Sequence, residues 1–321
     1  MRTRLTEVLG IEHPVMLAGM GGVSYAPLVT AVSDAGGFGC LGASTMSEEQ
    51  MVAEMAAVKA ATDKPFGVDL LTAMPGDLAA QVEQVIEGGA SVFVAGLGVP
   101  ADVVELCHRN QVVVVNMCGK VDHARRARDA GCDLVVAQGT EAGGHTGLVA
   151  TMPLVPQIVD AVGAEIPVVA AGGIFDGRGL AAALALGADG VWIGTRFIAT
   201  PEARAVTGYK DALLGTHEDG TVVSRAYSGK TMRVVANEYT RFFEEHGEEL
   251  TPFPGQLGRS IRDGAFHLGG DGATLGVDPA RECYPTGQGV GAIGSLVPAG
   301  RLVAGMVEEA ERVLTGLGAA G

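Results

Sequence analysis

One short stretch of the sequence, AQGTEAGGHTG at 137–147, concentrates residue types that could do chemistry. It carries one acid and one histidine, His145, among four glycines, which are Gly139, Gly143, Gly144 and Gly147. Glycines let a backbone approach a ligand closely, and an imidazole on such a backbone can accept or donate a proton near neutral pH. We therefore predict a functional role for His145. The other histidines are expected to be ordinary surface or core residues: His13, His108, His123, His217, His246 and His267.

Two later turns have residue types that bind phosphate. The strand-like run AAGGI ends in Gly172 and Gly173, and IGTRF contains Gly194 and Thr195. Backbone N–H groups and a threonine hydroxyl are donors for phosphate oxygens, although each turn could instead be a simple tight connection. Because the turns end two consecutive strand-like runs, we favour a phosphate site. A planar ring attached to that phosphate would lie over the neighbouring strands, with His145 on the substrate side.

Eight short apolar runs alternate with amphipathic patterns such as SEEQMVAEMAAVKAAT and VDHARRARDAG. The runs are VMLAGM (15–20), GFGCLGA (37–43), PFGVDLL (65–71), SVFVAGLG (91–98), VVVVNMC (112–118), LVVAQG (134–139), PVVAAGG (167–173) and GVWIGTRF (190–197). Near-continuous apolar strands are buried on both faces, as in a parallel sheet covered by helices. Eight such units predict an α/β fold, a (β/α)8 TIM barrel, whose active site lies at the carboxyl ends of the strands.

The alternation stops at Ile198, which divides the chain into three parts. We predict a cofactor-binding barrel over 1–204, a smaller and mostly helical insertion over 205–295 that covers the barrel mouth, and a C-terminal amphipathic helix within 296–321 that returns to the barrel. Inside the insertion, NEYTRFFEEHGEE is expected to form one helix.

Composition argues against several function classes. Asp and Glu outnumber Lys and Arg by 37 to 22, so a nucleic-acid groove or an anionic membrane surface is not expected. The N-terminus has no apolar h-region, and no run reaches the roughly 18 apolar residues of a membrane span. The five cysteines, without C-x-x-C spacing, indicate reduced thiols in a cytoplasmic protein and no zinc site. Assembly as a homodimer is left open.

Four segments together resemble a known family. They are HPVMLAGMGGVS, GTEAGGHTG, PVVAAGGIFDGRGLAAALALGADGVWIGTRF and SGKTMRVVANEYTRFF. They are similar to the nitronate monooxygenases, formerly called 2-nitropropane dioxygenases, and to the related flavin-dependent enoyl-ACP reductases. The resemblance runs over essentially the whole chain and implies a barrel that binds FMN.

The resemblance also implies roles for individual residues. His145 matches the catalytic histidine of the family, and Lys120 would stabilise anionic reduced flavin. The residues that would line or border the flavin ring are Gly19, Met20, Gly21, Gln138, Gly139, Gly143 and Gly144. The phosphate would be held by Gly172, Gly173, Gly194 and Thr195, and a loop near Gln288 would return toward the cofactor. Asp69 is a departure, because many members have Asn there, and an acid beside the flavin could alter its potential or the charge preference for substrate.

The leading hypothesis is therefore an FMN-dependent monooxygenase that oxidises alkyl nitronates with O2 to a carbonyl compound and nitrite. On this route His145 would bind the negative oxygens or take the α-proton of a neutral nitroalkane, and neither metal nor NAD(P)H is needed. The second hypothesis is an NAD(P)H-dependent reductase or a desaturase acting on an enoyl thioester or quinone, with Arg225, Lys230 and Arg233 meeting a phosphate. The third is a flavin- or phosphate-binding barrel without catalysis.

Two weaker motifs do not change this ranking. GVGAIG at 289–294 satisfies G-x-G-x-x-G but lacks the preceding strand of a dinucleotide fingerprint. Cys118 could be a nucleophile and is more simply a small wall residue. Barrels like IMP dehydrogenase use a cysteine after the sixth strand, and 139–152 contain none.

Overall fold

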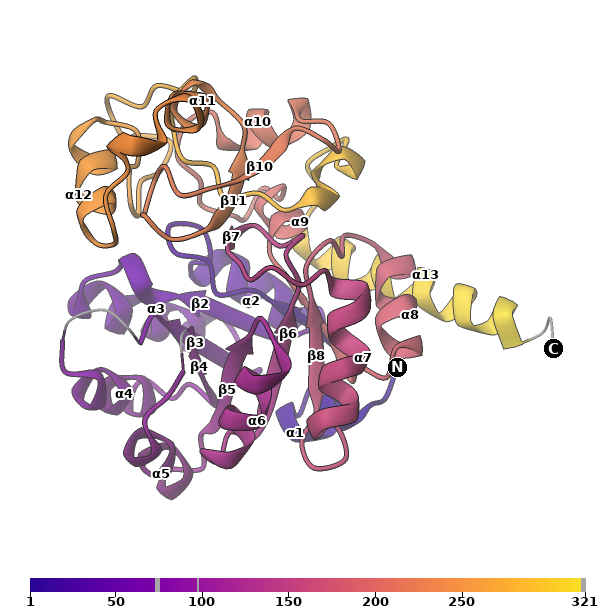
Figure 1. Ribbon diagram of the computed structural model, residues 1–321. Coiled ribbons are helices and arrows are strands. Elements are labelled where there is room, and N and C mark those ends of the chain that lie inside the picture. The colour runs from indigo at the N-terminus through magenta and orange to yellow at the C-terminus, as the bar shows by residue number, and fades with distance from the viewer. Residues whose placement is uncertain (73–75, 97, 319–321) are drawn as a thin grey trace.

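A computed structural model describes residues 1–72, 76–96 and 98–318 of the chain (Figure 1). Its centre is an eight-stranded parallel sheet in the order β1-β9-β8-β6-β5-β4-β3-β2. A bridge between Met16 and Phe38 joins the first strand to the residue that precedes the second, and this bridge closes the sheet into a barrel. The predicted (β/α)8 barrel is confirmed.

The barrel strands fall within the eight apolar runs expected from the sequence. They are β1 (Val15–Leu17), β2 (Gly39–Gly42), β3 (Phe66–Leu70), β4 (Val92–Ala95), β5 (Val113–Cys118), β6 (Leu134–Gln138), β8 (Val168–Ala171) and β9 (Gly190–Ile193). One core fills the barrel interior around Phe38, Leu134 and Trp192, and another packs the outer face of the sheet against the helices. Burial on both faces explains why these strands read as continuous apolar runs.

Helices cover the outside of the barrel, as Figure 1 shows. These are α2 (Ala26–Asp34), α3 (Glu48–Ala61), α4 (Leu78–Glu87), α5 (Ala101–Arg109), α6 (Val121–Asp129), α7 (Thr151–Val162), α8 (Gly177–Ala185) and α13 (Ala299–Gly318). By contrast, α1 (Arg4–Leu9) packs into the core of the barrel interior, and α9 (Thr195–Ile198) lies at the barrel mouth; a 3-10 turn η1 (Ala43–Thr45) follows β2. The C-terminal helix α13 packs against α8 and α2 on the outside of the barrel. Glu309 of α13 accepts the backbone N–H of Gly177 at 2.9 Å, which fixes it against α8. Within the described residues no helix has the length and apolar character needed to cross a membrane.

The insertion contains less helix than the sequence led us to expect. Its helices are α10 (Tyr209–Gly215), α11 (Glu238–Glu245) and α12 (Gly255–Arg262), with 3-10 turns η2 (Gly247–Glu249) and η3 (Gln288–Ala292). Between them lie irregular connections and a hairpin, β10 (Thr221–Ser224) and β11 (Met232–Val235). The segment NEYTRFFEEHGEE is not one helix, because α11 ends at Glu245 and His246 leaves the helical conformation.

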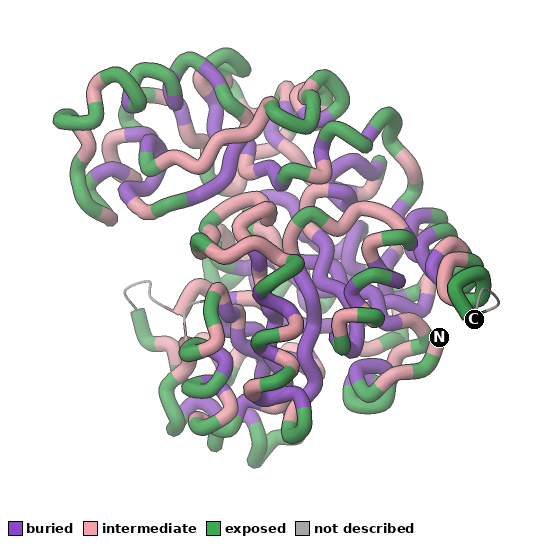
Figure 2. The backbone as a smooth tube through the Cα atoms, turned by 45° about the vertical axis from the view of Figure 1, so that its right-hand side comes forward, coloured by how far each residue is buried: buried purple, intermediate pink, exposed green. Residues whose placement is uncertain are grey.

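The insertion has a small core of its own, built on aromatic side chains. Tyr227 stacks on Tyr239 with ring centroids 5.1 Å apart, and Phe243 meets Tyr239 edge to face. These rings belong to a buried cluster that includes Met232 and Cys283. Figure 2 shows buried backbone inside both the barrel and the insertion. The insertion therefore has a core of its own and lies over the barrel mouth, which is where a barrel enzyme has its active site.

Candidate functional site

A cavity of about 640 Å³ lies between the barrel mouth and the insertion. Its floor comes from the carboxyl ends of the barrel strands, including Gly19, Asp69, Met117, Gln138, Gly172 and Gly194. Its roof comes from the insertion, including Ser228, Met232, Phe253, Phe266, His267 and Glu282. Such an enclosed space, mostly apolar with a few polar groups, is typical of a cofactor and substrate site.

The glycines of 137–147 admit neighbouring chain segments at close range. A side chain on Gly139 would overlap with Thr151 Oγ1, and one on Gly143 would come within 2.8 Å of the Gly287 nitrogen. Gly147 packs in the same way against Gly119, where a Cβ would lie 3.1 Å from the carbonyl oxygen. Gly144 has φ +74°, in the region that favours glycine. The glycines thus let the loop after β6 pack between the barrel, the insertion and η3.

The single acid of this stretch, Glu141, has a structural role. Its carboxylate accepts the backbone N–H of Thr151 at 2.8 Å and the Thr151 hydroxyl at 2.8 Å, at the N-terminus of α7. A carboxylate there satisfies free helix amides and suits the helix dipole. The Thr151 hydroxyl also lies 3.0 Å from the Gly172 carbonyl oxygen. Glu141 and Thr151 therefore connect the loop after β6 to the turn after β8.

His145 is held in the roof of the cavity by a short strand. Residues Gly144–His145 form β7, which pairs antiparallel with β11, with His145 opposite Met232. Gln138 Nε2 donates to the His145 carbonyl oxygen at 2.8 Å. The imidazole Nε2 lies 2.9 Å from Ser228 Oγ. Backbone pairing and two side-chain contacts thus fix the ring at the edge of the cavity.

The charge state of His145 favours the neutral imidazole. The residue has solvent-accessible surface at the cavity mouth, yet protein atoms surround the ring, and burial lowers the pKa of His145 below its ordinary value of 6.5. The Lys230 ammonium group lowers this pKa further. Burial disfavours an imidazolium, and a nearby cation repels it. A neutral imidazole has one N–H donor and one acceptor nitrogen, so it can donate a hydrogen bond to a ligand or accept a proton from it.

The two predicted phosphate turns lie side by side on adjacent strands. Gly172 and Gly173 follow β8 with φ of +104° and +73°, and Gly194 follows β9 as the residue before α9. At the start of α9, Phe197 and Ile198 donate to the Gly194 carbonyl oxygen, which leaves the Thr195 and Arg196 amides without an intrahelical acceptor. Thr195 Oγ1 accepts the Gly287 N–H at 2.9 Å, so the chain before η3 also reaches this point. Successive free amides of this kind form an anion-binding concavity that suits one phosphate group.

Asp69 lies at the end of β3, directly beside Gly19. A side chain on Gly19 would overlap with the Asp69 Cβ, so the two residues share the floor of the cavity. Burial raises the pKa of the Asp69 carboxyl well above its ordinary value of 3.8. The carboxyl group has no hydrogen-bond partner among the residues that the structure describes. It can therefore carry a proton at higher pH than an exposed aspartate and donate it to a ligand, as an asparagine amide at this position would.

Most of the predicted site residues line this cavity. They are Gly19, Met20, Gly21, Asp69, Gln138, Gly143, Gly144, His145, Gly172, Gly173, Gly194 and Thr195. Three predicted residues do not line it. Lys120 is exposed at the N-cap of α6, and Gly139 is buried against Thr151. The neighbours of Gln288, Gly287 and Gly289, line the cavity in its place.

The basic residues expected near a substrate phosphate do not act as one cluster. Arg233 is buried, and its guanidinium donates to the Thr140 carbonyl oxygen at 2.9 Å and to Thr221 Oγ1 at 3.1 Å. Arg225 donates to the Gly229 carbonyl oxygen at 3.0 Å. Lys230 places its ammonium group 4.3 Å from the centre of the Phe253 ring, which lines the cavity. Of these three cations, Lys230 is the one tied to the cavity wall.

Sequence reasoning missed three polar residues of the roof. Ser228 contacts His145, whereas His267 and Glu282 form a pair with Nδ1 2.6 Å from Oε2. Ser228 lies 83 positions from His145, and Glu282 lies 15 positions after His267 in irregular chain. No local motif marks either pair, so the sequence offered no signal for them.

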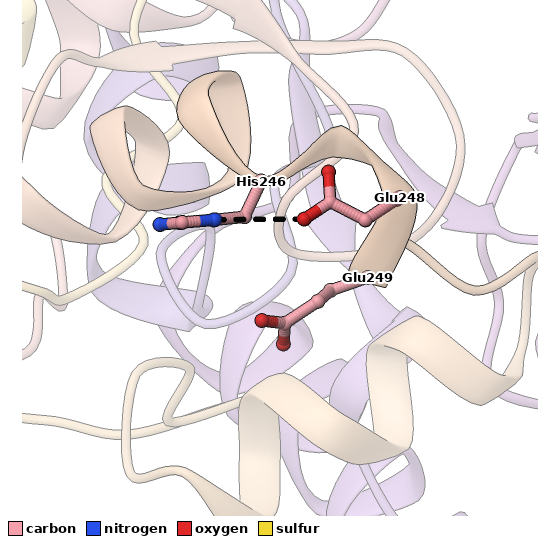
Figure 3. A group of neighbouring side chains, drawn as sticks. All are labelled: His246, Glu248 and Glu249. Atoms are coloured by element: carbon pink, nitrogen blue, oxygen red, sulfur yellow. Dashed lines mark ion pairs between the residues drawn. The ribbon is translucent and has the colours of Figure 1, made fainter.

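A second polar cluster lies away from the cavity. Figure 3 shows His246, Glu248 and Glu249, with His246 Nδ1 paired to Glu248 at 3.5 Å. These three residues are exposed, and the Glu249 carboxylate is paired with Arg259 at 2.8 Å. Exposed acidic groups of this kind are usually solvated, so we assign no ligand to this cluster.

Comparisons with known proteins agree with the geometry. The family model described as nitronate monooxygenase matches residues 2–83 and 76–309 of this chain. The (3aS,4S,5R,7aS)-5-hydroxy-7a-methyl-1-oxo-octahydro-1H-indene-4-carboxyl-CoA dehydrogenase of Mycobacterium tuberculosis is 44% identical, over 76% of this chain and 69% of that protein. FabK of Thermotoga maritima is 33% identical with a TM-score of 0.89, and each chain is covered completely. A nitroalkane oxidase of Streptomyces ansochromogenes is 30% identical with a TM-score of 0.85, over 98% of this chain and 99% of that one.

Proposed function

Because the chain belongs to the nitronate monooxygenase family, whose members are flavoenzymes in general, we propose that this oxidoreductase uses FMN to oxidise small alkyl nitronates. O2 is the proposed electron acceptor, and a carbonyl compound and nitrite are the proposed products. One observation carries the proposal: an oriented imidazole, His145, lines a cavity whose floor ends in two adjacent glycine turns, Gly172–Gly173 and Gly194–Thr195. The proposed setting is the cytoplasm, which is consistent with free and buried cysteines.

The residues of the cavity fit FMN. Gly172, Gly173, Gly194 and Thr195 would hold a single terminal phosphate on amides and one hydroxyl. The glycines and Met20 on the floor leave room for a planar ring, and Asp69 and Gln138 offer hydrogen bonds at its border. Bound FMN would supply the electron-accepting group of the reaction.

His145 would act on the substrate. A nitronate carries its negative charge on the two oxygens of the nitro group, and it needs a donor beside the ring. His145 would bind one of these oxygens, with Ser228 fixing the ring through Nε2. Lys230 would add a positive potential at the same wall, which attracts an anion into a chain of net charge −15.

A second candidate reaction is the dehydrogenation of an acyl-CoA thioester. The observation that favours it is the 44% identity to the CoA dehydrogenase. A thioester, like a nitroalkane, has an acidic hydrogen on the carbon next to an electron-withdrawing group. Lys230 at the cavity wall could meet a phosphate of CoA, whereas Arg233 is committed to Thr140 and Thr221.

Anaerobic reduction of the purified flavoprotein separates the candidates. Stopped-flow traces with propyl-1-nitronate, propyl-2-nitronate, butyryl-CoA, NADH and NADPH at equal concentration would be compared. Fastest bleaching by a nitronate supports the proposal. Bleaching by butyryl-CoA alone moves the assignment to thioester dehydrogenation. Bleaching by NADH or NADPH with none by a nitronate moves it to a reductase, and a protein that purifies without flavin contradicts all three.

A further inference from the structure

A carboxylate–imidazole pair in the roof of the cavity has no role in the function proposed above. The Glu282 side chain is 1% exposed, and Oε2 lies 2.6 Å from His267 Nδ1. The other oxygen, Oε1, accepts the backbone N–H of His267 at 2.9 Å. Both oxygens of a buried carboxylate are thus used to hold one histidine. A buried carboxylate is costly unless it is paired and hydrogen-bonded, so this arrangement fixes His267 firmly.

The pairing leaves the other ring nitrogen free. A carboxylate accepts hydrogen bonds, so Nδ1 carries the proton and Nε2 of a neutral ring presents a lone pair. Nε2 has no protein partner among the described residues, and 22% of the His267 side chain is exposed. His267 lines the same cavity as His145. In the catalytic triads of hydrolases, a carboxylate likewise accepts a hydrogen bond from Nδ1 while Nε2 accepts the reacting proton.

The two histidines approach the cavity from different sides. His145 is placed by β7, next to β6. The chain after His267 lies over the loops that follow β1 and β2. Gly269 packs against Gly22, and a Cβ on Gly269 would lie 3.3 Å from the Thr45 carbonyl oxygen. Arg204 holds this segment by donating to the Gly269 carbonyl oxygen at 3.0 Å. A substrate in the cavity can therefore have one imidazole on each flank.

We propose that His267, oriented by Glu282, is a second catalytic residue that removes the α-proton of neutral substrates, while His145 binds the substrate oxygens. This inference rests on the proposed function and names its substrate class as carbon acids, nitroalkanes first. In the step, the α-C–H bond breaks and its proton moves to His267 Nε2. The electron pair forms a C=N bond, and one N–O π pair moves onto oxygen, which yields the nitronate. Glu282 stays ionised and stabilises the imidazolium, which later returns its proton to water.

A nitronate that is already ionised does not need this step, which gives the test. His267→Asn keeps an amide nitrogen near the position of Nδ1, so the contact to Glu282 and the loop are retained while Nε2 is lost. In anaerobic flavin reduction we expect this variant to be slower with nitroethane by about 10² or more, the scale of general base catalysis. With ethyl nitronate, which needs no proton removal, its loss should be smaller than with nitroethane by about tenfold or more. Glu282→Gln, of the same shape, should show the same selectivity, and His145→Ala should slow both substrates.

Exchange of the α-hydrogens of nitroethane in D2O, followed by NMR, supplies a readout that needs no flavin chemistry. Wild-type protein should accelerate the exchange, and His267→Asn should abolish the acceleration. The proposal is overturned if the His267→Asn protein is reduced by nitroethane, and exchanges its hydrogens, at wild-type rates. The His267–Glu282 pair would then serve only to hold the loop in place. Equal losses with nitroethane and nitronate at full flavin content, in this variant and in Glu282→Gln, also overturn the proposal. If the wild type oxidises neither compound, the proposed function fails. The exchange experiment then decides the role of His267 separately: exchange that depends on His267 supports its assignment as a base, and absence of exchange refutes that assignment.

Discussion

The Nε2 atom of His145 lies 2.9 Å from Oγ of Ser228, a contact that spans 83 positions of the chain. Ser228 is buried in the insertion, whereas His145 follows a barrel strand. The hydroxyl also lies 3.3 Å from both the carbonyl oxygen and the N–H of Lys230. The orientation of the imidazole therefore depends on the docking of the insertion onto the barrel, and the same serine contacts both His145 and the backbone of Lys230.

Removal of this hydroxyl should impair catalysis and spare the cofactor. We expect Ser228→Ala to purify with normal flavin content and to oxidise nitronate about tenfold more slowly, because a hydrogen bond of roughly 1 to 1.5 kcal/mol that orients the imidazole is lost. The matched control is Ser224→Ala, whose hydroxyl accepts a backbone N–H of the same insertion. The measurement is kcat/KM with propyl-2-nitronate. An unchanged kcat/KM in Ser228→Ala would show that β7 alone positions His145.

Lys230 should set the pH at which His145 becomes neutral. Burial lowers the pKa of His145, and Lys230 lowers it further, so removal of the lysine charge raises this pKa. If turnover requires the neutral imidazole, the acidic limb of the kcat/KM profile moves to higher pH in Lys230→Met. Methionine preserves the packing on Phe253. Lys64→Met, which removes an exposed lysine paired with Glu12, should leave the limb in place. A shift to lower pH, or no shift, would contradict this account.

The turn after β8 should reject a second negative charge. Gly173→Asp is expected to yield colourless protein, because the carboxylate would occupy the space of the phosphate. The matched variant is Gly173→Asn, which has the same size and tolerates the positive φ of +73°. It should retain part of its flavin, since it differs from Gly173→Asp only in charge. Absorbance near 450 nm per mole of protein measures both. Full flavin content in Gly173→Asp would place the phosphate elsewhere.

The barrel and the glycine turns could be predicted because each depends on a pattern of residues that are adjacent in the chain. Strands buried on both faces appear as short apolar runs, and turns that follow them end in glycine. The insertion could not be predicted as well, because β11 pairs with β10 on one side and with β7, from a distant part of the chain, on the other. Barrel strands of the same length are recognisable because they are fully buried and apolar, whereas all four residues of β10 are half-buried and form no such run.

The site shows the same division between local and long-range information. His145, which lines the cavity, could be singled out as a candidate because its glycine-rich surroundings are contiguous in the chain. Ser228, His267 and Glu282 gain their roles only from contacts between distant segments. Gly139 illustrates the converse, because a glycine that admits a ligand and one that admits Thr151 read alike in a sequence. Local glycine-rich motifs thus indicated which turns line the cavity, and three-dimensional contacts decide which side chains face it.

Asp69 should make the stability of the protein depend on pH in a direction opposite to that of a salt-bridged aspartate. Burial raises the pKa of this carboxyl well above its ordinary value of 3.8, so the folded protein holds the proton more tightly than the unfolded chain does. Below about pH 4 both states are protonated and the group costs nothing. As pH rises above that value, the unfolded chain releases the proton first, and folding loses free energy until the folded carboxyl also ionises.

The variant Asp69→Asn removes this titration while it keeps a similar shape and a hydrogen-bond donor. We expect it to unfold at the same urea concentration as the wild type near pH 4 and to be more stable at pH 7, with a difference that grows between these values. The measurement is urea unfolding of apoprotein at closely spaced pH values, and flavin content checks that the donor at the ring border survives. Asp69→Ala is the control, because it removes the titration and the donor together and should lose flavin affinity. A wild-type protein that gains stability relative to Asp69→Asn as pH rises from 4 to 7 would show that the carboxylate is stabilised in the fold, and that an anion, not a proton donor, faces the ring.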